Sequence, residues 1–269
     1  MENKKEVVVT PLGTVSPYPK DNKNCPGFLI ECGDKKILLD CGEGSTRLLD
    51  MENDLNNLIV IISHLHKDHY SGLSGLGYAS YVYKNLGYIR NKIDVYIPKG
   101  DIVTDKKNSK IIEKNIPDFE YLMNYGSENY LNFIPYCDLD KIKYGDFKIS
   151  FEKNPHQLIT HSIKIEINDI SIVYSSDTGY FNNKLNTFAS NADLLICEST
   201  FLRNQNKKSD NHLYAYEAAM IAKEAKVKKL LLTHFWPEID KQEYVDEAKE
   251  IFFNVEAAEE GKKLVLKRG

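Results

Sequence analysis

A cluster of histidine and acidic side chains, directly after an apolar run, constrains this chain more than any other feature. Residues 58–62 are all leucine, isoleucine or valine, which predicts a β-strand buried on both faces. Where that strand ends, four residues of metal-ligand type fall within six positions: His64, His66, Asp68 and His69. Imidazole and carboxylate groups bind zinc and similar divalent ions. A merely solvated loop is the alternative, and the density of such side chains argues against it.

The spacing within the cluster indicates two metal ions rather than one. His64 and His66 lie two positions apart, so an extended or turning backbone points both imidazole rings the same way. Asp68 and His69 come one step later, where the chain turns into the next predicted helix. The sequence therefore predicts two adjacent ions, one on each pair of residues.

The pattern His64-x-His66-x-Asp68-His69 after a buried strand resembles the signature of the metallo-β-lactamase-fold hydrolases. The resemblance runs from about residue 7 to residue 265. It implies an α/β protein with the αββα sandwich, in which two mixed sheets are flanked by helices, as one domain over residues 1–269. Strands that alternate with helices in both halves of the chain fit that architecture.

The family also carries a later histidine, an aspartate that bridges both metals and a final histidine, each near a strand end. Here the resemblance points to His156, Asp177 and His234. It implies two Zn²⁺ ions, with Mn²⁺ as the alternative, and one shared ligand, Asp177. The implied ligands are His64, His66 and His156 for one ion and Asp68, His69 and His234 for the other.

Two assignments stay open at this point. His161 begins the next predicted strand and competes with His156 as the third-motif ligand, although the place of His156 in the loop after a strand favours His156. Asp40, which follows a predicted strand, matches the family's first motif, where the aspartate orients a metal-binding histidine. A simple turn at the strand end explains Asp40 equally well.

Two further residues resemble the proton-transfer pair of ribonuclease Z, a branch of this family. Residues 193–201 resemble its His-Glu-Ala-Thr stretch and place Glu198 at a strand end, and residues 211–215 resemble its His-Ser-Thr stretch and contain His212. In that branch the histidine protonates the leaving oxygen as a general acid, paired with the glutamate. The resemblance therefore implies that Asp68, Glu198 and His212 are catalytic.

The chain also departs from ribonuclease Z. Cys197 stands where that enzyme has histidine, and Asp177 follows His156 by only 21 residues, too few for the protruding arm that grips tRNA. The formal net charge of −4 and a pI near 6.0 provide no global basic field. We therefore do not expect tRNA as a partner. Arm-less phosphodiesterases of the anti-Pycsar type, which destroy cyclic pyrimidine nucleotides, resemble this chain in length and in the Glu198/His212 pair.

These observations predict a dinuclear metal-dependent phosphodiesterase that hydrolyses 3′,5′-cyclic nucleotides to linear monophosphates. A ribonuclease Z-like RNA nuclease and a thioester or lactone hydrolase of the same fold are the alternative enzymes. A catalytically inactive metal-binding protein is the alternative from a different class.

The charged first residues lack the apolar core of a signal peptide, and no apolar stretch approaches the roughly 18 residues of a membrane span. We therefore expect a cytoplasmic protein without a membrane partner.

Aromatic residues bear on a protein partner, because the chain contains 17 tyrosines. Residues 72–90 predict a helix on which Tyr81 and Tyr88 form one row. A second, apolar stripe on that helix is expected to pack into the core: Tyr78, Val82, Leu86 and Ile89. An irregular insertion around 101–137 carries Phe119, Tyr121, Tyr125, Tyr130, Phe133 and Tyr136, as a covering lid or a stacking surface. We expect a homodimer through Tyr81, Tyr88 and tyrosines 121–136.

Two later helices complete the sequence-based expectation. Residues 211–226 predict a helix with Asn211 as its cap, and Tyr244, Ala248, Ile251 and Val255 mark the apolar face of a closing helix.

Overall fold

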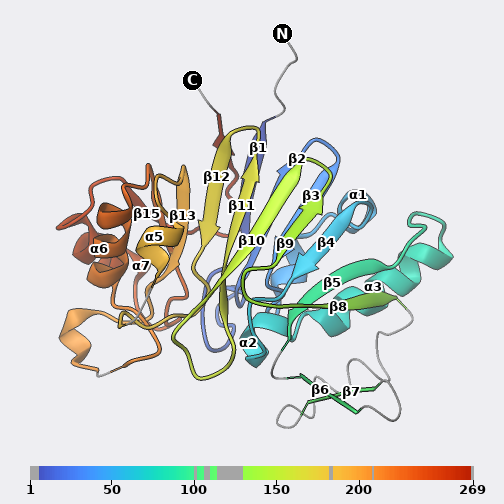
Figure 1. Ribbon diagram of the computed structural model, residues 1–269, viewed down its shortest axis with the longest axis horizontal. Coiled ribbons are helices and arrows are strands. Elements are labelled where there is room, and N and C mark those ends of the chain that lie inside the picture. Colours follow the sequence, from blue (N-terminus) through green and yellow to red (C-terminus); the bar gives the residue numbers. More distant parts are fainter. Residues whose placement is uncertain are drawn as a thin grey trace.

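Two seven-stranded sheets lie face to face, and helices cover the outer face of each (Figure 1). The computed structural model describes residues 6–99, 102–105, 110–113, 130–181, 184–207 and 209–267. In spatial order, the first sheet consists of β16 (Leu264–Leu266), β1 (Val7–Gly13), β2 (Gly27–Cys32), β3 (Lys35–Leu39), β4 (Leu58–Ile61), β5 (Ile93–Pro98) and β8 (Leu131–Tyr136). The second consists of β15 (Val255–Ala257), β14 (Leu230–Thr233), β13 (Leu194–Glu198), β12 (Ile170–Tyr174), β11 (His161–Ile167), β10 (Phe147–Lys153) and β9 (Lys141–Tyr144).

Both sheets are mixed in the same way. The run from β3 through β4 and β5 to β8 is parallel, as is the run from β12 through β13 and β14 to β15. The remaining strands pair antiparallel, and a separate hairpin is formed by β6 (Ile102–Asp105) and β7 (Lys110–Glu113). The predicted αββα arrangement of two mixed sheets flanked by helices is confirmed.

The helices divide between the two outer faces. Figure 1 places α1 and α3 on the side of the first sheet and α5, α6 and α7 on the side of the second, with α2 at one end of the sandwich. Their bounds are α1 (Met51–Asp54), α2 (Lys67–Tyr70), α3 (Leu73–Asn85), α5 (Leu185–Phe188), α6 (Ala215–Ala225) and α7 (Lys241–Lys249). None of the described helices has the length and apolar composition that crossing a bilayer requires.

Three hydrophobic cores follow from this layering. One lies between the sheets and includes Phe28, Ile37, Ile165 and Tyr174, all almost fully buried. The other two lie between each sheet and its helices. The parallel strands contribute side chains to two cores at once, which explains why their sequences are continuous apolar runs rather than alternating ones.

The helix predicted over 72–90 ends at Asn85. Of its predicted buried stripe, Ile89 is buried, whereas the prediction is wrong for Tyr78, Val82 and Leu86. Leu73, Leu76 and Ser80 are the buried residues that face the sheet, whereas Tyr78 and Leu86 are 61% and 63% exposed. Gly87, with φ of +82°, provides the left-handed residue that commonly ends a helix. The sequence offers two apolar helix faces, one that contains Leu73 and Leu76 and one that contains Tyr78. Their spacings look alike in the sequence, and packing against the sheet selected the face of Leu73.

The two later helices also begin and end differently from the prediction. The helix expected over 211–226 begins only at Ala215, because the Glu217 side chain accepts a hydrogen bond from the backbone of Tyr214 and caps the first turn. Asn211 is therefore not a cap but part of a loop. The closing helix ends at Lys249, and Val255 starts β15 instead of continuing that helix.

Part of the aromatic insertion belongs to the core. Tyr136 ends β8, is 1% exposed, and donates a hydrogen bond to the carbonyl oxygen of Ile62. The expectation that Tyr136 serves a lid, a base or a dimer contact is therefore wrong. Tyr130 packs its ring 4.9 Å from that of Tyr81. The predictions for Phe119, Tyr121 and Tyr125 lie outside the described residues.

Candidate metal centre

The candidate ligands lie after the carboxyl ends of strands that meet at one edge of the sandwich, with Asp68 and His69 in the short helix α2 that follows β4. The loop after β4 carries His64 and His66 and leads into α2, which begins at Lys67. His156 follows β10, Asp177 follows β12 and His234 follows β14. This convergence is expected, because the binding sites of α/β proteins generally lie beyond the carboxyl ends of the sheet strands.

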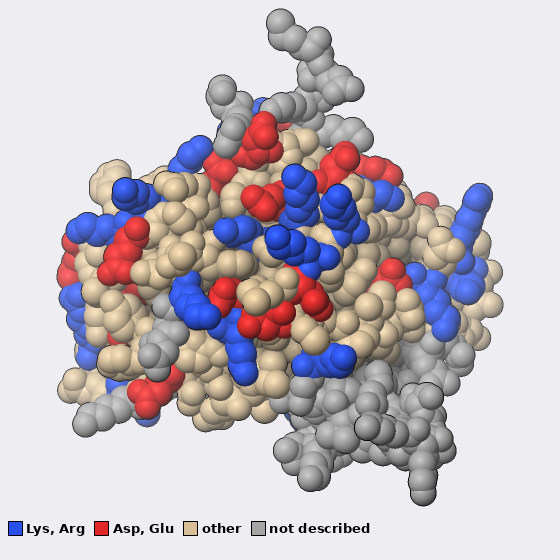
Figure 2. Space-filling model, in the orientation of Figure 1, with Lys and Arg blue, Asp and Glu red and all other residues tan. Residues whose placement is uncertain are grey.

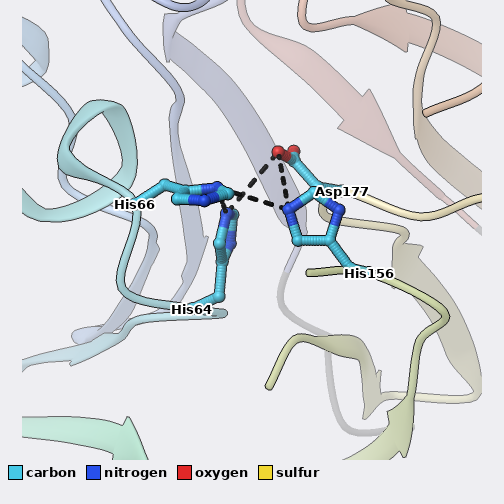
Figure 3. Close-up of side chains that lie close together, drawn as sticks. All are labelled: His64, His66, His156 and Asp177. Carbon is cyan, nitrogen blue, oxygen red and sulfur yellow. Dashed lines mark hydrogen bonds and ion pairs between the residues drawn. The ribbon is translucent and has the colours of Figure 1, made fainter. Parts of the chain in front are cut away.

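Three histidines and one carboxylate oxygen form a first cluster, whose side chains point toward one another in Figure 3. The His66 Nδ1 atom lies 3.0 Å from His64 Nε2 and 3.3 Å from His156 Nε2. The Oδ2 atom of Asp177 is 3.5 Å from His64 Nε2 and 3.8 Å from His156 Nε2. Four ligand-type atoms thus surround one point, as a tetrahedral divalent ion requires.

A second cluster contains Asp68, His69 and His234. Asp68 Oδ2 lies 3.6 Å from His69 Nε2 and 3.7 Å from His234 Nε2, and the two imidazole nitrogens are 3.4 Å apart. Ser16, from the loop after β1, donates a hydrogen bond of 2.6 Å to the same Asp68 oxygen. The Ser16 contact was not predicted, since nothing in the sequence of that loop marks it.

Asp177 lies between the two clusters and offers one oxygen to each. Its Oδ1 atom is 3.3 Å from His69 Nε2 and 3.1 Å from His234 Nε2, on the side opposite to the first cluster. This oxygen is fully buried and has no hydrogen-bond partner. A buried carboxylate oxygen without a partner is costly, and a cation shared between Asp177 and the imidazoles would remove that cost.

Hydrogen bonds behind the clusters select the same tautomer for three histidines. Carboxylate and carbonyl oxygens only accept, so His69 donates its Nδ1–H to Asp40 Oδ2 at 2.7 Å and His156 donates to the Asn211 carbonyl at 3.0 Å. Thr200 donates its hydroxyl proton to Glu198 and therefore accepts from His234 Nδ1 at 2.8 Å. In its neutral form, each of these rings has an Nε2 lone pair that faces its cluster, as metal binding requires.

The Asp40 carboxylate is held in place by several hydrogen bonds rather than simply lying at a turn. It accepts hydrogen bonds from the Ser63 backbone and hydroxyl, from the Tyr174 hydroxyl and from His69. The contact to His69 is the one expected from the resemblance of Asp40 to an orienting aspartate, whereas a turn alone would leave the carboxylate in solvent.

Electrostatics of the centre favour a cation. Burial lowers the pKa of His64 well below its ordinary value and that of His66 to about 4, so both rings are neutral. Burial also acts on His69, but the carboxylates of Asp177, Asp68 and Asp40 outweigh it and raise the pKa of His69. Three buried carboxylates around one imidazole are an excess of negative charge, and a divalent ion between them would neutralise it.

Glu198 and His212 form a second functional pair beside the clusters. His212 Nδ1 lies 3.0 Å from Glu198 Oε1 and 3.9 Å from Asp177 Oδ2. Burial disfavours the charged imidazole, yet attraction to Glu198 outweighs burial and raises the pKa of His212 to about 9. The ring therefore carries a proton at neutral pH. Thr200, which links Glu198 to His234, was missed although it lies in the stretch that resembles ribonuclease Z.

Backbone strain is concentrated at the same edge. Asp40, Ser176 and His234 adopt φ values of 55°, 51° and 65°, a region that non-glycine residues rarely enter. Each directly follows or closely follows the end of a strand at the centre. Such strain persists where the surroundings enforce it and is typical of functional sites.

His161 does not join the centre. It is the first residue of β11, and its ring is 1% exposed and packs edge-on against Tyr136 with ring centroids 5.1 Å apart. Its backbone N–H donates to the Ser63 carbonyl. Of the two histidines that the sequence left in competition, the one beside Asp177 is His156.

Comparisons with known proteins agree with this geometry. The model of the family described as anti-Pycsar protein Apyc1 matches residues 7–257. The chain is similar to "Probable metallo-hydrolase YhfI" of Bacillus subtilis, with 29% identity over 227 residues that cover 84% of this chain and 86% of YhfI. The crystal structure of YhfI, described as a metallo-β-lactamase-fold protein, superposes with a TM-score of 0.82 at 28% identity over 97% of this chain and 99% of that one. Ribonuclease Z of Chlamydia trachomatis serovar L2 is 29% identical over 293 residues, 94% of this chain and 95% of that protein.

Proposed function

Because the chain belongs to the family of the anti-Pycsar protein Apyc1, we propose that it opens 3′,5′-cyclic nucleotides to linear monophosphates. The fold is that of the metallo-β-lactamases, and the chain is a metal-dependent hydrolase of the phosphodiesterase type. The substrate, the identity of the metal and the residues that carry the reaction are the parts that we propose.

The position of Asp177 between two ligand clusters is the observation that carries this proposal. We assign one ion to His64, His66 and His156 and the other to Asp68, His69 and His234, with Asp177 shared. Two divalent ions so held would lower the pKa of a water and stabilise charge on the phosphate oxygens. The predominance of imidazole ligands favours zinc, with manganese as the alternative.

The remaining residues hold and move protons. Ser16 holds Asp68 by a short hydrogen bond, so that this carboxylate can accept a proton from the attacking water. Glu198 holds the His212 ring and stabilises its charged form, so that His212 can donate a proton to the departing sugar oxygen. A protein that only stored metal would need neither the buried carboxylate nor the proton donor.

Charge and shape favour a small substrate over tRNA. The net charge is −4, and Figure 2 shows basic and acidic side chains intermingled on the face drawn there. Proteins that grip a polynucleotide generally present a basic surface, because each phosphate contact adds to affinity. Between His156 and Asp177 the chain forms only β11, β12 and short connections, so this interval contains no arm.

A substrate panel tests the proposal. The zinc-loaded protein is incubated with 3′,5′-cyclic purine and pyrimidine mononucleotides, with cyclic dinucleotides and with a tRNA precursor. We expect linear monophosphates from the cyclic mononucleotides and an intact tRNA precursor. Cleavage of the tRNA precursor, with all cyclic nucleotides left intact, would instead support the second candidate function, a ribonuclease Z-like nuclease, which the similarity to chlamydial ribonuclease Z favours.

The role of His212 is tested separately with two leaving groups. His212→Ala should slow opening of a cyclic nucleotide by roughly 10²–10⁴-fold, the usual contribution of a positioned general acid. A nitrophenyl phosphodiester has a leaving group that departs without a proton, so its hydrolysis should fall far less. Equal losses on both substrates would show that His212 supports binding or folding instead.

We also propose that the protein acts as a homodimer in the cytoplasm. Helix α3 and the turn after it expose five large apolar side chains: Tyr78, Tyr81, Val82, Leu86 and Tyr88. Tyrosine offers apolar area with a polar tip, which suits interface cores. A second copy of the chain can cover such a face through a two-fold axis that presents the same patch from both sides.

A further inference from the structure

A hollow of about 230 Å³ lies at the same edge of the sandwich as the metal centre. It is formed by the loops that follow β1, β14 and β15, and its apolar wall includes Val15, Phe235, Trp236 and Ile239. Pockets that enclose a whole drug-sized ligand generally exceed about 300 Å³, so this hollow is suited to part of a ligand.

The hollow adjoins the metal centre on two sides. Val15 and Phe235 pair in a parallel bridge, and the Ser16 N–H donates to the Phe235 carbonyl at 2.9 Å. The next residue along the first segment, Ser16, holds Asp68, and the residue before Phe235 is His234. Two chain segments therefore each contribute one residue to the hollow and its sequence neighbour to the centre.

Trp236 connects the hollow to the proposed proton donor. Its indole lies edge-on to Phe201 with ring centroids 5.5 Å apart, and Phe201 lies 6.1 Å from the ring of His212. The indole is therefore within about 12 Å of the imidazole. The Lys207 ammonium sits 5.7 Å from the indole centroid, so an exposed side chain reaches this ring.

The rim of the hollow is polar. Asn22, Lys23, Lys241 and Glu259 line it together with the apolar wall, and both lysines are exposed. A flat heterocycle with hydrogen-bonding edges matches an aromatic wall and a rim of donors and acceptors. An aliphatic group would leave the polar rim without hydrogen-bond partners. A purely anionic group would leave the apolar wall without a packing partner.

We propose that this hollow is the nucleobase subsite and that Trp236 is the surface on which the base stacks. This assignment rests on the proposed function, since it takes the scissile phosphate to lie at the metal centre. The sugar then spans the distance between the centre and the indole, beside His212, and places the departing sugar oxygen near the proton donor.

The proposal is directly observable because Trp236 is the only tryptophan of the chain. Fluorescence of the zinc-loaded protein is excited at the red edge of the indole band, where nucleotides absorb little. Adding a nucleoside monophosphate should quench Trp236 in a saturable manner, whereas ribose 5-phosphate, which has the phosphate but no base, should not. Equal quenching by both would overturn the proposal.

Kinetics provide the second test. Stacking of a base on an aromatic ring contributes roughly 1–3 kcal/mol, so Trp236→Ala should raise KM for a cyclic nucleotide roughly 5- to 150-fold with little change in kcat. Trp236→Phe should give a smaller rise. Phe253→Ala removes an aromatic ring that is 90% exposed and does not line the hollow, and it should leave KM unchanged.

The outcomes separate the two proposals. If the wild-type protein hydrolyses no cyclic nucleotide but its tryptophan is quenched by nucleoside monophosphates, the proposed function fails and the base subsite stands. If the wild type is active but Trp236→Ala, with normal circular dichroism and metal content, keeps the wild-type KM, the subsite is wrong and the proposed function stands.

Discussion

Single residues decide what this centre can hold, and Asp177 is the most informative of them. Its two oxygens face different clusters, and the one toward His69 and His234 is buried without a hydrogen-bond partner. This side chain belongs to the first cluster, and its Oδ1 atom also faces two histidines of the second. The metal content of a variant at this position therefore reports on both sites at once.

Asp177→Ala should lose both ions, whereas substitution of a ligand that belongs to only one cluster should lose one ion. Elemental analysis of protein purified without chelator should find close to two zinc or manganese ions per wild-type chain, about one in His156→Ala, and close to none in Asp177→Ala. A wild-type content of one ion or none would contradict the dinuclear assignment.

His156 and His161 allow a matched comparison, because one faces Asp177 and the other packs on Tyr136. His156→Phe should lower the metal content and abolish activity. His161→Phe keeps an aromatic ring against Tyr136 and should leave the metal content unchanged. The reverse pattern would show that His161 is the ligand.

His161 also predicts a pH dependence of stability. Burial lowers its pKa from the ordinary 6.5 to about 4 in the folded protein. Between these values the unfolded chain binds a proton that the folded chain does not, so this residue contributes stability above pH 6.5 that is lost as the pH falls toward 4. At 1.36 kcal/mol per pH unit, the loss is about 2 kcal/mol between pH 6.5 and 5.

Urea unfolding at several pH values checks this expectation. The free energy of unfolding should fall more steeply with decreasing pH in the wild type than in His161→Phe, and the difference between the two isolates His161 from the histidines of the centre. Parallel curves for both proteins would mean that His161 is not held neutral.

At the scale of elements, the centre depends on loops that touch one another. Gly179, after Asp177, donates its N–H to the Pro155 carbonyl, and a Cβ on it would lie 1.8 Å from the Asp210 carbonyl oxygen. The loop before α6 can therefore approach only because residue 179 has no side chain. That approach brings His212 to Glu198 and the Asn211 carbonyl to His156.

Gly179→Ala should push the loop around residue 211 away and lower kcat at least tenfold on cyclic nucleotides, with a smaller effect on a nitrophenyl diester. Gly75→Ala is the control, because its Cβ would meet only Thr46 Oγ1, at 3.9 Å, and alanine is favoured over glycine within α3 by up to about 1 kcal/mol. Wild-type kinetics in Gly179→Ala would disprove the role of this close contact.

At the scale of the whole molecule, α3 and the turn after it expose a group of large apolar side chains among the residues that the structure describes. Tyr78 and Leu86 are more than 60% exposed, although the sequence pattern predicted that they would be buried. An apolar helix face directed to solvent favours association, and a second copy is the partner that symmetry makes simplest.

Leu86→Glu should convert a dimer to a monomer, since a charge at the centre of a two-fold interface meets its own copy. Light scattering at micromolar concentration gives the mass. Phe253→Glu, at an exposed apolar residue outside α3, should leave the dimer intact. A monomeric wild type would remove the proposed interface.

The sequence alone determined the features that depend on neighbours in the chain. The buried strand before His64, the spacing of His64, His66, Asp68 and His69, and the strand ends at Asp177 and His234 all follow from local apolar runs and short motifs. The αββα class was implied by the resemblance to the metallo-β-lactamase-fold hydrolases, and the alternation of strands and helices along the chain fitted it.

Only the tertiary structure decided which loops meet and which faces are covered. It brought His156 rather than His161 to Asp177, joined Thr200 to both Glu198 and His234, and turned Tyr78 of α3 and Leu86 directly after it to solvent. These outcomes depend on contacts between segments that are far apart in the chain. Strand context favoured His156 over His161, but no periodicity or spacing within one segment showed which loop reaches Asp177 or which helix face the sheet covers.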